Sequence, residues 1–89
     1  MTFKIQKSTE RGHVVLTLSG RINEGLAQEL REQIKIESVN AVITLDLKEV
    51  QLVDRGVVRF LAQSEMDGIK LQNCPPYIRE WIHRERQRA

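Results

Sequence analysis

Apolar and polar residues alternate in two short runs at the start of the chain. In TFKIQKS, at 2–8, they fall on opposite sides of an extended backbone, and this period of two predicts a half-buried strand. In HVVLTLSG, at 13–20, valines and leucines alternate in the same way. The polar segment TERG at 9–12 contains a glycine and joins the two runs. The pattern therefore predicts a β-hairpin.

The apolar period then lengthens to that of a helix. Leu26, Leu30 and Ile34 are four residues apart, so they share one face of a helix within 20–38. Asn23 is the predicted N-cap, because its side chain can accept a hydrogen bond from a free amide of the first turn.

A second helical pattern covers 54–68. Val57, Val58 and Leu61 follow the helical period. Asp54 is predicted to cap the start of this helix, and Gly68 to end it.

A third helix is predicted from Cys74 onward, where two prolines suit a helix start. It contains two apolar pairs at a spacing of four, Tyr77 with Trp81 and Ile78 with Ile82. We expect this apolar face to dock on the domain's own sheet. A second copy of the protein is the alternative.

The remaining segments complete an α/β pattern. AVITLDL at 41–47 is almost continuously apolar, which indicates an interior parallel strand covered on both faces. KEVQLV at 48–53 is interpreted as a connection, and IKLQN at 69–73 as a short strand. The order β-β-α-β-α-β-α predicts one domain over 1–89. Its mixed four-stranded sheet, an N-terminal hairpin plus a parallel run, is packed by helices.

Composition narrows the possible classes of protein. The chain has 89 residues and a net charge of +2. Its arginine-rich end is interrupted by Glu80 and Glu85, so we expect no nucleic-acid partner. A single cysteine permits no internal disulfide and suggests a reducing compartment. With no apolar core near the N-terminus and no run long enough to span a membrane, we expect a cytoplasmic protein.

Motifs for catalysis or metal binding are missing from the sequence. His13 and His83 are far apart, and Cys74 has no partner at metal-ligand spacing. Neither a nucleophile turn nor a phosphate-binding loop is present. We therefore expect a non-enzymatic protein without cofactor or metal. Cys74 could be activated by the following helix start, but a buried, inert thiol is favoured.

The stretch VITLDLKEVQLVDRGVVRFLAQSEMDGIKLQNC, at 42–74, resembles the STAS family, the sulfate transporter and anti-sigma factor antagonist domain. In that family, a strand ending Leu-Asp-Leu precedes a hydrophobic residue and an aspartate. Ser-Ser-Gly-Leu then usually opens a helix. ITLDL and the pair Val53–Asp54 match this pattern, and HVVLTLSGRI is similar to the family's early strand, with Gly20 and Ile22 in place.

The sequence departs from the family at the helix start. Without gaps, Arg55 takes the place of the first serine and Gly56 that of the second, which anti-sigma kinases phosphorylate in switching members. Glycine has no hydroxyl, and 49–63 contains no serine, threonine or tyrosine. Thr44 and Ser64 are the nearest hydroxyl residues. The resemblance thus implies a short member that is not phosphorylated at the family position.

The resemblance implies a protein-binding domain whose partner is an anti-sigma factor or another signalling protein. The expected contact residues lie at the second helix start and at the first cap: Asn23, Glu49, Asp54, Arg55, Gly56 and Arg59. Whether Arg55 is kept for contact or is simply solvated stays open. Two other hypotheses are a small-ligand-binding or accessory STAS subunit of a signalling or transport complex, and a module that forms homodimers through its last helix.

Overall fold

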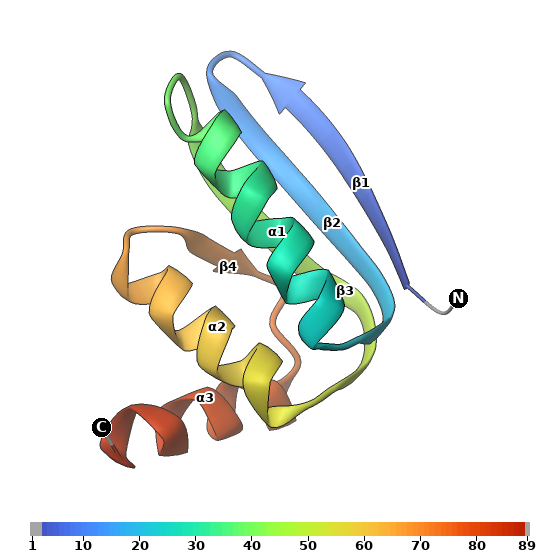
Figure 1. The fold of residues 1–89 in the computed structure, drawn as a ribbon, viewed down its shortest axis with the longest axis vertical. Coiled ribbons are helices and arrows are strands. Elements are labelled where there is room, and N and C mark those ends of the chain that lie inside the picture. The colour runs from blue at the N-terminus through green and yellow to red at the C-terminus, as the bar shows by residue number, and fades with distance from the viewer. Residues whose placement is uncertain (1–2, 89) are drawn as a thin grey trace.

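The computed structural model describes residues 3–88 and confirms the predicted order of elements (Figure 1). Thr2, which the first predicted strand includes, and Ala89 of the last helix lie outside the described residues. The elements are β1 (Phe3–Glu10), β2 (His13–Ile22), α1 (Glu24–Glu37), β3 (Val42–Val53), α2 (Arg55–Met66), β4 (Lys70–Gln72) and α3 (Pro76–Arg88).

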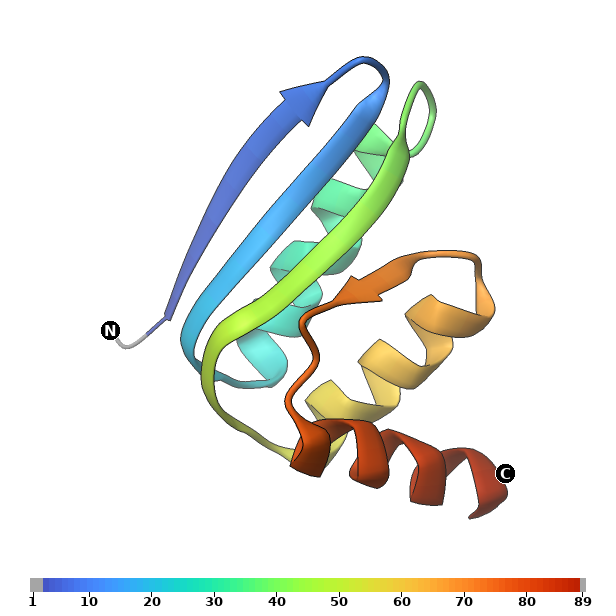
Figure 2. The ribbon, with the colours of Figure 1, turned by 180° about the vertical axis from the view of Figure 1, so that it is seen from behind.

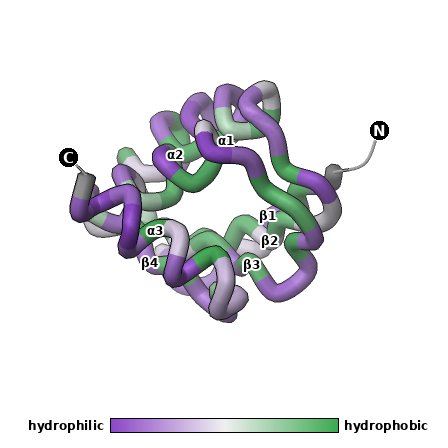
Figure 3. The backbone as a smooth tube through the Cα atoms, turned by 90° about the horizontal axis from the view of Figure 1, so that it is seen from below, coloured by the Kyte–Doolittle hydropathy of each residue, from purple (hydrophilic) through white to green (hydrophobic). Residues whose placement is uncertain are grey.

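The four strands form one mixed sheet in the order β1-β2-β3-β4, as predicted. β1 and β2 are antiparallel, whereas β2, β3 and β4 are parallel. α1 and α2 lie together on one face of the sheet (Figure 3), yet residues 43–47 of β3 are all buried, so this part of the strand is covered on both faces as expected. Thr44 and Asp46 alternate with the core residues of β3, and Asp46 Oδ1 accepts a hydrogen bond from Asn73 Nδ2 at 3.2 Å.

β3 is longer than the sequence indicated, and this corrects the prediction of a connection at 48–53. The strand continues to Val53 and pairs with β2 to the end. The register shifts twice against β2, between the partners of Thr17 and Ser19 and again between those of Gly20 and Arg21. Each shift inserts an extra residue into β3, a β-bulge that breaks the alternation of a regular strand. A search for apolar residues at every second position therefore does not detect this part of the strand.

The core is a single cluster between the sheet and the helices. It takes apolar side chains from β2, β3 and β4 and from all three helices. The largest fully buried side chains are Leu16, Leu18, Leu26, Leu30, Leu45, Leu47, Leu61, Ile78, Ile82, Val14, Val57 and Val58. The hairpin, by contrast, leaves β1 at the edge of the sheet, with largely exposed side chains.

The last helix packs mainly against α2 and not on the sheet, which corrects the predicted docking surface. In Figure 2 it lies beyond the end of the long strands, beside α2. Ile78 and Ile82 are buried, whereas Trp81 is only partly buried and Tyr77 is 49% exposed. Ile78 and Ile82 thus anchor the helix, whereas Tyr77 and Trp81 are less buried.

Within residues 3–88, the helices are all too short or too polar to cross a membrane.

Candidate functional site

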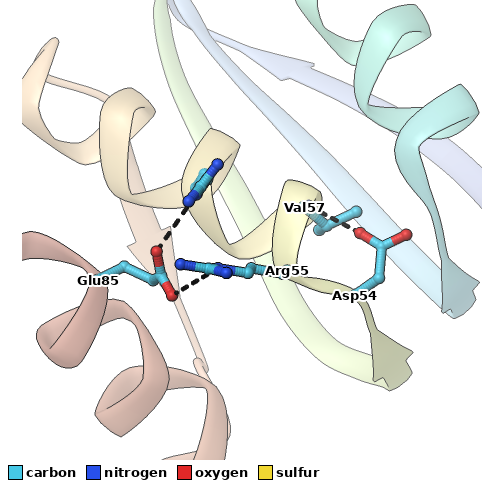
Figure 4. Close-up of polar contacts among 5 residues, drawn as sticks. Asp54, Arg55, Val57 and Glu85 are labelled. Atoms are coloured by element: carbon cyan, nitrogen blue, oxygen red, sulfur yellow. Dashed lines mark hydrogen bonds and ion pairs between the residues drawn. The ribbon is translucent and has the colours of Figure 1, made fainter. Parts of the chain in front are cut away.

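Two helices begin side by side at the carboxyl end of the parallel strands β2 and β3. Ile22 and Val53, the last residues of β2 and β3, are register partners, so the next residue of each strand starts a helix at the same place. The Oδ1 atom of Asn23 accepts a hydrogen bond from the Leu26 amide at 3.1 Å. The Oδ1 atom of Asp54 accepts one from the Val57 amide at 2.9 Å (Figure 4). Both predicted N-caps are confirmed.

We call this region the paired-cap surface. It comprises Asn23, Glu24, Leu52, Asp54, Arg55 and Gly56. The free amides of two helix starts face the same edge, and each helix start carries partial positive charge. The surface is therefore built from backbone polarity together with a few exposed side chains.

Gly56 lies directly against a carboxylate that the sequence did not suggest. A Cβ atom added to Gly56 would overlap the carboxylate of Glu24, the first residue of α1. The missing side chain thus makes room for a negative charge from the neighbouring helix. A carboxylate near a helix start is stabilising, by about 0.3–1 kcal/mol at an exposed position. Glu24 of α1 therefore lies beside the start of α2.

Arg55 turns toward α3. Its Nε atom donates to Glu85 Oε2 at 3.2 Å, and Arg59, one turn further along α2, donates from Nε to Glu85 Oε1 at 3.3 Å (Figure 4). The Glu85 side chain is only 9% exposed, whereas Arg55 and Arg59 are 52% and 62% exposed. One carboxylate of α3 thus holds two arginines of α2, which offsets the unfavourable position of a cation at a helix start.

A reciprocal cluster lies further along the same two helices. Glu65 of α2 accepts from Arg79 at 2.8 Å and from Arg86 at 3.4 Å, both on α3. Glu65 falls on the face whose apolar period predicted the helix, and it meets these arginines there. The buried pair Ile78 and Ile82 is therefore accompanied by ion pairs that run in both directions between α2 and α3.

Burial acts to raise the pKa of Glu85, but the hydrogen bond from Arg59 and the charges of Arg55 and Arg59 outweigh it, and the pKa is lowered. A carboxylate whose pKa is lower in the folded than in the unfolded state stabilises the fold above its unfolded pKa, about 4.3 for glutamate. This stabilisation is lost as the pH falls through the lowered value.

This predicts a pH-dependent effect of Glu85→Gln. At pH 7 the variant should unfold at a lower temperature than the wild type. The difference should shrink as the pH falls below about 4, because protonation removes the same charge from the wild type. Circular dichroism melts from pH 7 to pH 3 measure it, with Glu32→Gln on the exposed side of α1 as control. A difference that stays constant across this range would show that Glu85 does not stabilise the fold through its charge.

The two bulges of β3 shape the strand beside the paired-cap surface. At the first, the Lys48 amide donates to Asp46 Oδ1 at 3.1 Å. At the second, the Gln51 carbonyl accepts from the Tyr77 hydroxyl at 3.1 Å. Each bulge thus has a polar contact with a side chain. Leu52, immediately after the second bulge, is 55% exposed, so the end of the strand presents an apolar side chain next to Asp54.

The structure brings some of the predicted contact residues together and separates others. Asn23, Asp54, Arg55 and Gly56 meet on the paired-cap surface. Arg59 lies beside Glu85, and Glu49 is exposed within β3 without a polar contact to the others among residues 3–88. Sequence reasoning missed Glu24 and Glu85. Glu24 could have been suspected from its place after the Asn23 cap, but nothing in the sequence connects Arg55 with a residue 30 positions away.

Cys74 is half-buried just before α3, and burial raises the pKa of its thiol. The charge of Arg79 acts in the opposite direction and that of Glu65 in the same direction. A raised pKa means less thiolate, which is the reactive form, and this favours the inert interpretation. Among residues 3–88, no group of three or more histidine, cysteine or acidic side chains could hold a metal ion.

The arrangement is the fold of STAS domains. One similar solved structure is the anti-sigma factor antagonist SpoIIAA in its unphosphorylated form, at 17% identity and a TM-score of 0.65. The alignment covers 88% of this chain and 78% of that one. Another is a STAS-domain antisigma-factor antagonist from Rhodobacter sphaeroides, at 8% identity and a TM-score of 0.63. The alignment covers 81% of this chain and 87% of that one.

A third similar structure is that of Mglu, at 22% identity and a TM-score of 0.63. The alignment covers 80% of this chain but 19% of Mglu, so the chain spans about a fifth of that protein. Comparison with protein-family models gives no match, and comparison with curated proteins gives none either.

Proposed function

We propose that this chain is a non-enzymatic protein-binding domain that acts in the manner of an anti-sigma factor antagonist. The observation that carries the proposal is the paired-cap surface, where two capped helix starts meet at the end of two parallel strands. Arg55 contributes a side chain that is still 52% exposed, and Leu52 an apolar one that is 55% exposed. Exposed apolar side chains and arginines beside free backbone amides suit contact with a protein.

The similar solved structures support the choice of partner. Two of them are described as anti-sigma factor antagonists. We therefore infer that the partner of this chain is an anti-sigma factor or another signalling protein that recognises the same edge of the fold. Glu49, Asp54, Gly56, Arg59 and Asn23 complete the proposed contact region.

The same surface supports a second part of the proposal, that binding is not switched by phosphorylation at the start of α2. Gly56 has no hydroxyl, and 49–63 contains no serine, threonine or tyrosine. The space above Gly56 already holds the Glu24 carboxylate. Ser64, the next hydroxyl along the chain, is 4% exposed and donates to the Phe60 carbonyl within α2 at 2.8 Å, so it is a poor substitute for a phosphorylated serine at the helix start.

Leu52 provides the test, because charge reversal at Arg55 or Arg59 would also face Glu85 and disturb the packing of α3. Leu52→Glu should weaken binding of the cognate anti-sigma factor at least about tenfold, the effect of losing about 1.4 kcal/mol. Isothermal titration calorimetry against each anti-sigma factor encoded in the source genome measures it.

Val42→Glu is the matched control. Val42 lies on the same strand and is 56% exposed, close to the 55% of Leu52, but it is at the opposite end of β3. Its replacement should leave the affinity within about twofold, as expected of a site outside the contact. If no anti-sigma factor binds, the role as an anti-sigma factor antagonist is wrong. If both variants bind like the wild type, the paired-cap surface is not the contact.

A further inference from the structure

A groove runs between α1 and α2 on the side of the helices away from the sheet. Figure 1 shows the two helices side by side on one face of the sheet. The groove has a volume of about 480 Å³, within the range of small-molecule sites. Its lining includes Ile34, Phe60 and Ile69, with Arg31, Lys35 and Arg59 beside them.

The floor of the groove is apolar. Ile34 and Ile69 are partly buried and pack against the core. Phe60 is 5% exposed, and the Arg31 guanidinium lies 5.3 Å from the centroid of its ring. An apolar side chain placed here would be removed from water on contact with these residues, which is favourable in proportion to the buried area.

The sides of the groove are mainly cationic. Arg31 donates to the neutral Gln28 side chain at 3.0 Å. Within residues 3–88, neither Arg31 nor Lys35 forms an ion pair with a carboxylate. Asp67 is the one acidic residue in the lining, and it accepts from Gln63 at 3.2 Å. An anionic ligand would therefore meet two cations, Arg31 and Lys35, that are not already neutralised by an ion pair, whereas Arg59 is paired with Glu85.

From these features we propose that the groove binds a single-chain carboxylate amphiphile, such as a medium-chain fatty acid. The carboxylate would pair with Arg31 and Lys35, and the chain would lie over Ile34 and Ile69. The lining extends along α1 from Arg31 to Ser38, about two helical turns or on the order of 10 Å. This length suits an extended alkyl chain of about eight carbons.

The test is an NMR titration of the whole ¹⁵N-labelled chain with octanoate, below the concentration at which it forms micelles. Saturable shifts should concentrate on the amides of the facing halves of α1 and α2. Octanoate should bind more tightly than hexanoate, by up to about fourfold for each methylene that the groove buries. Octyltrimethylammonium, which has the same chain and the opposite charge, should bind at least about tenfold more weakly, because charged hydrogen bonds are lost.

Arg31→Glu/Lys35→Glu tests the head group, and Lys4→Glu/Lys70→Glu is the control with the same change in net charge on exposed strand positions. The first pair should weaken octanoate binding at least about tenfold, and the control pair should leave the shifts in place. Equal binding of hexanoate and octanoate, equal binding of the cation, or an unaffected Arg31→Glu/Lys35→Glu variant would overturn the proposal. So would groove shifts that follow protein concentration and not octanoate, because they would place a second copy there.

Discussion

Replacing Ile82 by alanine should destabilise the domain by about 2–5 kcal/mol, the range for buried isoleucine or leucine truncations. Ile82 is 1% exposed and belongs to the same core cluster as the residues of the sheet. Its loss would leave a cavity beneath α3, beside the buried side chain of Ile78. Since small domains have about 5–15 kcal/mol of stability in total, this is a large fraction.

Trp81→Ala is the comparison that makes the result specific. Trp81 is the larger side chain, and from the sequence it is the obvious anchor of the helix. In the structure it is only partly buried, in a hollow that Tyr77 and Arg55 also line. Its truncation should therefore cost less than that of Ile82 and less than the roughly 3–5 kcal/mol of a buried tryptophan.

Urea unfolding of both variants, followed by far-ultraviolet circular dichroism, measures the two free energies of unfolding. It should be carried out at two protein concentrations about a hundredfold apart. A larger loss for Trp81→Ala, together with a midpoint that rises with concentration, would indicate that a second copy buries Trp81.

Replacing Asp54 by alanine should cost about 0.5–2 kcal/mol, because the Val57 amide loses the oxygen that caps it. The corresponding loss for Asn23→Ala should be smaller. The helix that Asp54 caps, α2, also carries Arg55 and Arg59 and their contacts to α3. Thermal and urea unfolding give the change in stability.

Asp54→Asn separates the two roles of this residue. Asparagine is as good an N-cap as aspartate, so the variant should keep nearly all of the stability while losing the charge. If Asp54 also contacts the partner through its charge, Asp54→Asn should weaken binding without a change in the unfolding midpoint. An Asp54→Ala variant as stable as the wild type would show that the cap bond does not support α2.

The sequence was most informative where local chemistry decides the structure. Asn23 and Asp54 were recognisable as caps because each precedes an apolar helical period, and the cap bond joins residues three positions apart. The order of strands and helices followed from the same periods. These features depend on a few neighbouring residues, so one sequence contains all that is needed to predict them.

Features that depend on distant residues could not be predicted in this way. The two bulges of β3 are defined by its pairing with β2. They interrupt the alternation of apolar residues, so 48–53 was predicted as a connection. The position of α3 depended on which of two equally spaced apolar pairs would be buried. Helical spacing alone cannot choose between Ile78 with Ile82 and Tyr77 with Trp81, since both pairs lie four residues apart.

The contact between Glu24 and Gly56 has a consequence for how this sequence can change over evolutionary time. Any side chain acquired at 56 would meet the Glu24 carboxylate, so Glu24 would have to turn away and leave the start of α2. A mutation to serine would therefore place a side chain where the Glu24 carboxylate now lies. It would also displace a charge, and the two positions should covary among homologues: acidic residues at 24 where 56 is glycine, and other residues where 56 has a side chain.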